Sequence, residues 1–133
     1  MAVSWSSNGL DAAQLDKNRT FQITGDLTLT SADSGKAFVV KGGNSTFSLP
    51  ATAPGLIFTF VYQGKDYGST INISPVSADG VAAVGSSVVN KDVILNGATI
   101  RKGDFVTIAS GAGASGITAW HVTAQRGILT KEA

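Results

Sequence analysis

Hydrophobic and polar residues alternate with a period of two in several short segments of the chain. These segments are residues 26–30, 45–50 and 70–74. Successive side chains of a β-strand point to opposite faces, so this alternation predicts strands with one buried face. Residues 37–40 and 56–62 are instead almost continuously apolar and rich in β-branched and aromatic side chains. They predict central strands that are covered on both faces.

Turn-forming residues separate the predicted strands. They are Asp33-Ser34-Gly35, Lys41-Gly42-Gly43-Asn44, Pro54-Gly55 and Gly64-Lys65-Asp66-Tyr67-Gly68. Glycine supplies positive φ and proline a preset φ, so these turns predict a meander of antiparallel hairpins. Asn96-Gly97 is the strongest two-residue hairpin signal and predicts that residues 92–95 pair with residues 98–101. The small residues of 76–89 predict a long loop or an irregular strand.

These elements predict an all-β fold in a single domain, residues 20–133, preceded by an N-terminal arm, residues 1–19. About eight strands with short turns favour an antiparallel β-sandwich or a small barrel. The length of 133 residues suits one domain of this kind.

Composition adds a low charge to this picture. Only 14% of the residues are charged, against about 25% in typical globular chains, so apolar surface and hence a partner are expected. The ten Lys and Arg residues are spread along the sequence and the net charge is +1, which does not favour nucleic acid as a partner. No apolar run approaches the roughly 20 residues that cross a bilayer, so no membrane partner is expected. The absence of Cys suits a chain that matures in a reducing cytoplasm.

Candidate catalytic groups are few. His121 is the only histidine, and a general base or a metal ligand needs partners that its sequence neighbours do not offer. We expect it at the surface of a strand or in an interface, on the face opposite Trp120. Asp79, Asp92 and Asp104 lack the ligand spacing of a calcium loop, so structural roles are favoured. The sequence therefore predicts no catalytic, cofactor-binding or metal-binding residue, and a protein that is not an enzyme.

The N-terminal arm carries apolar side chains in a polar segment. Val3, Trp5 and Leu10 have no strand around them that could bury them. A tryptophan in such a place docks either on its own domain or on a neighbouring molecule. We predict that these three residues contact a partner. Three other aromatic residues could form a sugar-stacking platform, although core and rim packing is favoured for them: Tyr62, Tyr67 and Trp120.

Several strand-and-turn segments resemble small β-rich structural proteins of tailed bacteriophages over residues 20–127. They are Asp33-Ser34-Gly35-Lys36-Ala37-Phe38-Val39-Val40, Ser45-Thr46-Phe47-Ser48-Leu49-Pro50, Gly55-Leu56-Ile57-Phe58-Thr59-Phe60-Val61, Thr70-Ile71-Asn72-Ile73-Ser74-Pro75 and Gly103-Asp104-Phe105-Val106-Thr107-Ile108, with Trp120 near the end. Within that group the chain is most similar to capsid decoration, or cement, proteins. The resemblance carries over no individual binding residue.

This resemblance implies a virion structural protein that binds the outer capsid surface and stabilises the head. It implies two partners, the major capsid protein and further copies of the chain in a homotrimer. The protein would be made in the host cytoplasm and would end on the capsid surface. The alternative is a tail-fibre or tailspike module that binds a host receptor or a glycan, and a third, weaker one is an enzyme fragment.

Overall fold

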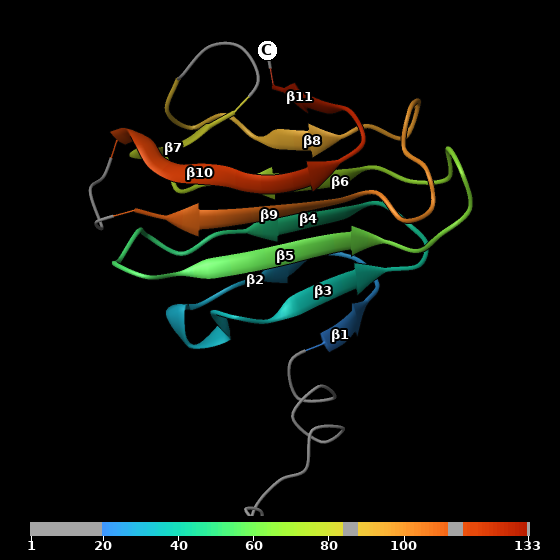
Figure 1. Cartoon of the computed structure of the whole chain (residues 1–133), viewed down its shortest axis with the longest axis horizontal. Helices are drawn as coiled ribbons and strands as arrows, with labels where there is room; N and C mark the ends of the chain where they lie inside the picture. Colours follow the sequence, from blue (N-terminus) through green and yellow to red (C-terminus); the bar gives the residue numbers. More distant parts are fainter. Residues whose placement is uncertain (1–19, 84–87, 112–115, 133) are drawn as a thin grey trace, which may run out of the picture.

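The structure is a computed structural model that describes residues 20–83, 88–111 and 116–132. It contains strands and one short 3-10 helix, η1 (Ser31–Asp33), so the predicted all-β class is confirmed (Figure 1). The strands are β1 (Thr20–Ile23), β2 (Leu27–Thr28), β3 (Ala37–Val40), β4 (Ser45–Ser48), β5 (Ile57–Tyr62), β6 (Ile71–Ser74), β7 (Asp79–Ala82), β8 (Val93–Leu95), β9 (Phe105–Ser110), β10 (Gly116–Arg126) and β11 (Leu129–Lys131). The predicted contact residues Val3, Trp5 and Leu10, like the rest of the arm, lie outside the described residues.

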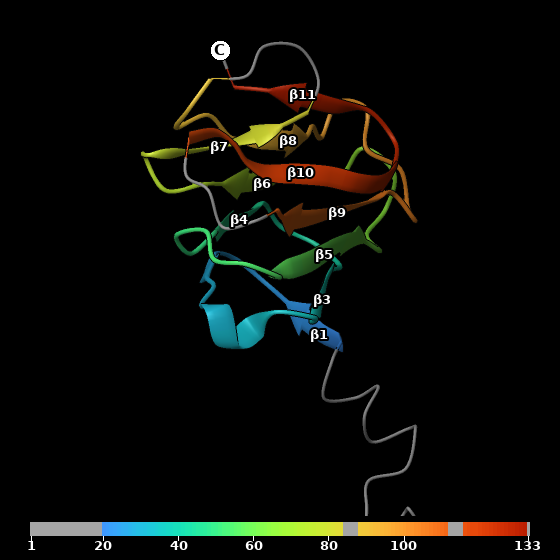
Figure 2. The ribbon, with the colours of Figure 1, turned by 60° about the vertical axis from the view of Figure 1, so that its left-hand side comes forward.

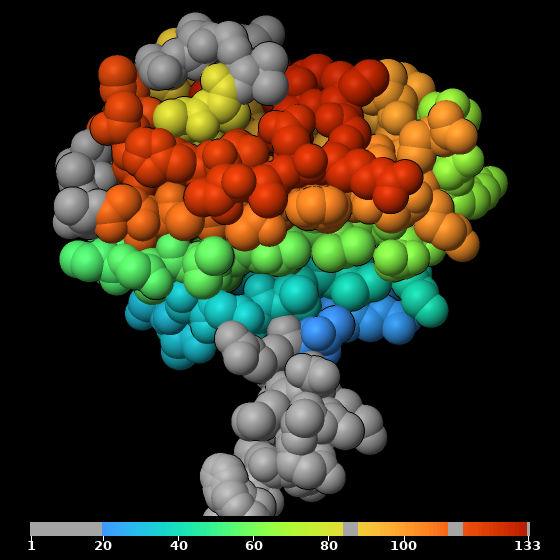
Figure 3. Space-filling view, viewed as in Figure 1, coloured from blue at the N-terminus to red at the C-terminus, as the bar shows by residue number. Residues whose placement is uncertain are grey.

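The strands form two mixed sheets. One has six strands in the order β1-β3-β5-β9-β10-β7, and the other has five in the order β11-β8-β6-β4-β2. In Figure 1 the six-stranded sheet lies in front of the five-stranded one, and Figure 2 shows the same two layers after a 60° turn. The space-filling view shows β1, β3, β5, β9 and β10 as successive bands from blue to red (Figure 3).

The first six strands alternate between the sheets, and this corrects the predicted antiparallel meander. β1, β3 and β5 run parallel in one sheet, while β2, β4 and β6 run parallel in the other. Each glycine turn carries the chain across to the other layer, so the intervening strand provides the crossover that parallel neighbours need. The turn residues were identified correctly, but a turn signal does not say which sheet the next strand joins.

Every antiparallel pair among the described strands involves β8 or β9. β9 pairs antiparallel with β5 and β10, and β8 does so with β6 and β11, while β7 is parallel to β10. β7 lies within the segment that predicted a loop or an irregular strand. The described residues contain eleven strands rather than about eight.

The hairpin predicted at Asn96-Gly97 is wrong. β8 is followed by a turn in which the amides of Thr99 and Ile100 both donate to the Asn96 carbonyl, at 3.0 and 2.8 Å. The Asn96 side chain accepts from the Ala98 amide at 2.8 Å, and the Gly97 amide donates to Thr70 Oγ1 at 2.8 Å. These hydrogen bonds hold the backbone in a local turn, so residues 98–101 form no strand.

The core lies between the two sheets and is rich in phenylalanine. Phe47 of the five-stranded sheet packs against Phe38 and Phe60 of the six-stranded sheet, with ring centroids 5.7 and 4.7 Å apart. Phe58 meets the Trp120 ring at 5.8 Å, and all these side chains are buried. The buried faces of β4 and β6 follow the predicted alternation.

The strands predicted to be covered on both faces are covered fully on one. β3 and β5 are internal in their sheet, but Ala37, Val39, Thr59 and Val61 are half-buried, and Ile57 is exposed. The described residues form two layers, so the outer face of each sheet meets solvent. A continuous apolar run identified an internal strand here, not a strand buried on both sides.

Candidate binding faces at the two ends of the strands

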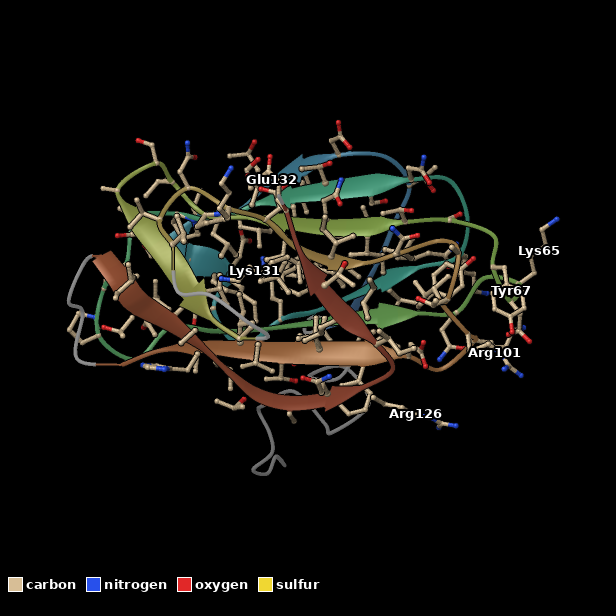
Figure 4. The ribbon with its side chains drawn as sticks, turned by 90° about the horizontal axis from the view of Figure 1, so that it is seen from above. Lys65, Tyr67, Arg101, Arg126, Lys131 and Glu132 are labelled. Carbon is tan, nitrogen blue, oxygen red and sulfur yellow. The ribbon has the colours of Figure 1, made fainter. Side chains whose placement is uncertain are left out.

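Five cationic residues gather at one end of the molecule, in or beside the loops that follow β3, β5, β8 and β10. They are Lys41, Lys65, Arg101, Lys102 and Arg126. Figure 4 shows Lys65, Tyr67, Arg101 and Arg126 at the same end of the ribbon. Lys41 and Lys65 line one pocket, and the Arg126 guanidinium lies 3.7 Å from the point that a Cβ on Gly103 would occupy. We call this region the basic end.

Hydrogen bonds clamp the β5–β6 loop to the β8–β9 loop at the basic end. The Tyr67 amide donates to the Ile100 carbonyl at 2.8 Å, and the Lys102 amide donates to Asp66 Oδ1 at 2.9 Å. Asp66 Oδ2 also pairs with Arg101 Nε at 3.2 Å. The Lys102 amide and the Arg101 charge lower the pKa of Asp66 below its ordinary value, so the carboxylate stays ionised at neutral pH.

The β5–β6 loop wraps around the hydroxyl of a buried tyrosine. Tyr62 is the last residue of β5, and its hydroxyl donates to the Lys65 carbonyl at 2.7 Å. A Cβ on Gly64 or Gly68 would lie 2.5 or 2.7 Å from that hydroxyl. The residue with positive φ in this turn is Tyr67, so these two glycines serve close approach and not the positive φ that the sequence suggested.

Tyr67 presents its ring to solvent from a strained backbone position. Its φ is 60°, in the left-handed region that few non-glycine residues adopt, and 57% of the residue is exposed. Arg101 Cζ lies 5.5 Å from the ring centroid, within the range of a cation–π contact. Tyr67 and Asp66 raise the pKa of Arg101 above its ordinary value, so the guanidinium remains charged.

Two pockets flank the β5–β6 loop. One, of about 340 Å³, is lined by Tyr67, Ala98, Thr99, Arg101, Asp104, Gly127 and Ile128. The other, of about 360 Å³, is lined by Lys41, Gly42, Gly43, Tyr62, Lys65, Gly68 and Ser69. A ligand at the basic end can therefore meet an aromatic ring, an exposed aliphatic side chain and several cations within one surface.

The opposite ends of the strands form a surface with a different character. Part of this surface, residues 49–57, 75–78 and 110–111 together with Ile117, carries no charged side chain, and we call this part the uncharged end. Charged residues border it: the Asp33–Lys36 ion pair lies near Ile57, whose amide donates to Ser34 Oγ at 3.0 Å, and Lys91 and Asp92 precede β8 at the same strand ends. Hydrogen bonds join its segments: Ser110 donates its amide to the Leu56 carbonyl at 2.9 Å, and Gly116 donates to the Ala78 carbonyl at 3.1 Å. Ile57 and Ile117 are exposed there, at 42% and 46%.

The residues considered for chemistry do not gather at one site in the described part of the chain, although Asp104 lines the pocket beside Tyr67. His121 is exposed on β10, next to the buried Trp120. Asp79 and Asp104 are buried and accept backbone amides, from Thr52 at 3.1 Å and from Arg101 at 2.9 Å. Within the described ranges, no three His, Cys, Asp or Glu residues gather to hold a metal ion. No helix in the same ranges is long and apolar enough to cross a membrane.

The three aromatic residues considered for a sugar platform separate into two groups. Tyr62 and Trp120 are fully buried, so they serve the core, as the favoured interpretation held. Tyr67 alone is accessible.

The basic end was missed because its cations lie in four different parts of the sequence, and the loop positions that bring them together depend on the strand order.

The fold and these two surfaces define an all-β protein with two candidate binding faces at opposite strand ends. No protein-family model matches the chain, and no curated protein matches it.

Proposed function

We propose that this chain is a non-enzymatic phage virion protein that binds the outer capsid surface and stabilises the head. The observation that carries the proposal is an uncharged patch with two exposed isoleucines, Ile57 and Ile117, at the strand ends opposite the basic end. The uncharged end would face the major capsid protein, and the basic end would face solvent. The two facing sheets, taken as a sandwich, would provide the rigid body that holds these faces apart.

The uncharged end suits burial against a protein lattice for a physical reason. Charged groups at an interface lose hydration and must find partners, whereas small, apolar and hydroxyl-bearing residues are buried at little cost. β1 is an edge strand of its sheet among the described residues. Its first residue, Thr20, pairs with Ala37 of β3, which in turn pairs with Thr59 of β5. The start of β1 therefore lies toward the strand ends that carry Ile57, and the proposed partner contacts of Val3, Trp5 and Leu10 would add to this face.

Charge insertion at the uncharged end should weaken capsid binding. Ile57→Lys and Ile117→Lys each place an ammonium group at a position that is exposed in the free protein, so the fold should remain stable. In the complex the same charge would be buried without a partner, which disfavours binding. We expect co-sedimentation with purified capsids to weaken by about tenfold or more, equivalent to about 1.4 kcal/mol. Ile128→Lys is the matched control, since Ile128 is exposed at the basic end. Equal loss in all three variants would contradict this orientation.

Removal of residues 2–16 should separate folding from assembly. We expect the thermal unfolding of the domain to change little, while capsid binding weakens because Val3, Trp5 and Leu10 are lost. Differential scanning calorimetry and the co-sedimentation assay measure the two effects. If the deletion unfolds the domain, the arm belongs to the core and the partner-contact assignment fails.

The free protein should form a homotrimer. The low charge of 14% argues for self-association through apolar contact, and the resemblance to decoration proteins suggests three-fold symmetry. Moderate salt should not dissociate the trimer, because few ion pairs would hold it. Sedimentation equilibrium at micromolar protein is the measurement. A single species near 13.5 kDa would disprove self-association, and a stable dimer would disprove the three-fold arrangement.

The second candidate function is a tail-fibre or tailspike module that binds a receptor or a glycan. It is favoured by a specific observation, the exposed Tyr67 ring beside Arg101 at the basic end. Co-sedimentation with empty capsids compared with purified tails separates the two candidates.

A further inference from the structure

We infer that the basic end holds a binding site for an acidic carbohydrate, a polymer of uronic acid units, centred on Tyr67 and Arg101. The site does not depend on capsid binding, because it lies at the strand ends opposite the proposed capsid face. It rests on an exposed aromatic ring, a cation fixed beside it, and the adjoining 340 Å³ pocket.

The Tyr67 ring supplies the stacking surface. The face of an aromatic ring is electron-rich, and the C–H groups on one face of a pyranose ring carry a partial positive charge, so the two surfaces attract. Ile128, 58% exposed, lines the same pocket and adds an apolar wall. Thr99 offers a hydroxyl group on the pocket wall, where sugar hydroxyl groups need hydrogen-bond partners.

Arg101 supplies the selectivity for a carboxylate. Its ion pair with Asp66 involves Nε, and 60% of its side chain remains exposed. A planar, exposed guanidinium can bind a carboxylate through two parallel hydrogen bonds. Lys41 and Lys65 line the second pocket on the other side of the β5–β6 loop, so a neighbouring acidic unit of the same polymer would meet a further positive field.

The site is held in place before any ligand arrives. The Tyr67 and Lys102 amides, together with the Asp66 carboxylate, hydrogen-bond the β5–β6 loop to the β8–β9 loop. The buried Tyr62 hydroxyl also donates to the Lys65 carbonyl and fixes the β5–β6 loop on the core. A backbone φ of 60° at a tyrosine costs free energy and persists where the surroundings enforce it, which is typical of functional positions. A rigid site loses less entropy on binding.

A carbohydrate fits these features better than a nucleic acid does. Proteins that bind single strands combine a continuous basic groove with several stacking aromatic side chains. Among the described residues of the basic end, only Tyr67 presents an exposed aromatic ring, and Asp66 interrupts the cations. The geometry supports one stacked ring with charges at its sides, as a sugar with a carboxylate requires.

The test is calorimetric titration of the intact protein with oligogalacturonate. Three further ligands serve as comparisons. The methyl ester of the same oligomer lacks the negative charge, polyglutamate has the charge but no sugar, and a single-stranded oligonucleotide represents nucleic acid. Tyr67→Asn removes the ring and keeps a residue that tolerates positive φ, with Ile117→Asn as its control. Arg101→Gln removes the cation, with Lys91→Gln as the control for charge.

We expect oligogalacturonate to bind best, and both site variants to weaken it by about tenfold or more while the controls change it less than about twofold. The methyl ester should bind more weakly than the acid, and polyglutamate more weakly still. Absence of oligogalacturonate binding would overturn the proposal. So would equal binding of polyglutamate, tighter binding of the oligonucleotide, or binding that Tyr67→Asn leaves intact. None of these results would bear on capsid co-sedimentation, which tests the other end of the molecule.

Discussion

Phe60→Ala should lower the free energy of unfolding by about 3–5 kcal/mol, and Phe58→Ala by a similar amount. Phe60 is fully buried, and its ring lies 4.7 Å from that of Phe47 and 5.8 Å from that of Phe38. Its removal leaves a cavity between the two sheets, which the strands cannot close because their backbones are held in register on both sides.

Ile57→Ala is the matched control in the same strand. Ile57 is 42% exposed at the first position of β5, so its truncation removes little buried area and should cost less than about 1 kcal/mol. Urea unfolding followed by circular dichroism measures all three variants. A loss below about 1 kcal/mol at both phenylalanines would contradict a core shared by the two sheets.

The sequence predicted the local structure of this protein well. Alternation at Phe47 and Ile71 identified strands and their buried faces, because the two-residue period of a strand is a local property. The turn at Gly42-Gly43 was equally clear. Strand partners were not predictable in this way, because the same turn permits a hairpin within one sheet or a crossing to the facing sheet.

The candidate binding site depended on the same missing information. Lys41, Lys65 and Arg101 are far apart in sequence, and only the strand order brings their loops to one end. The positive φ of Tyr67 was also not predictable from the sequence, because Gly64 and Gly68 in the same turn were the expected residues with positive φ. By contrast, the exposed position of His121 on the face opposite Trp120 could be anticipated from the two-residue alternation of a strand.

Gly127→Ala should lower the free energy of unfolding by about 2–5 kcal/mol, through two separate effects. Gly127 has φ of 107°, a conformation that side chains with a Cβ disfavour. A Cβ there would also lie 2.5 Å from Asp104 Oδ2. Asp104 is only 4% exposed and accepts the Arg101 amide at 2.9 Å, so it cannot move away without breaking that hydrogen bond.

Gly25→Ala separates the two effects. Gly25 has φ of 85°, but no atom lies within 4 Å of its added Cβ, so the substitution should cost only the backbone strain, about 1–2 kcal/mol. The difference between the two variants in urea unfolding gives the cost of the contact with Asp104. Because Gly127 and Asp104 both line the pocket at Tyr67, Gly127→Ala should weaken oligogalacturonate binding as well, whereas Gly25→Ala should not. Equal stability losses for the two alanine variants would show that Asp104 is free to move and that the pocket wall is not fixed as proposed.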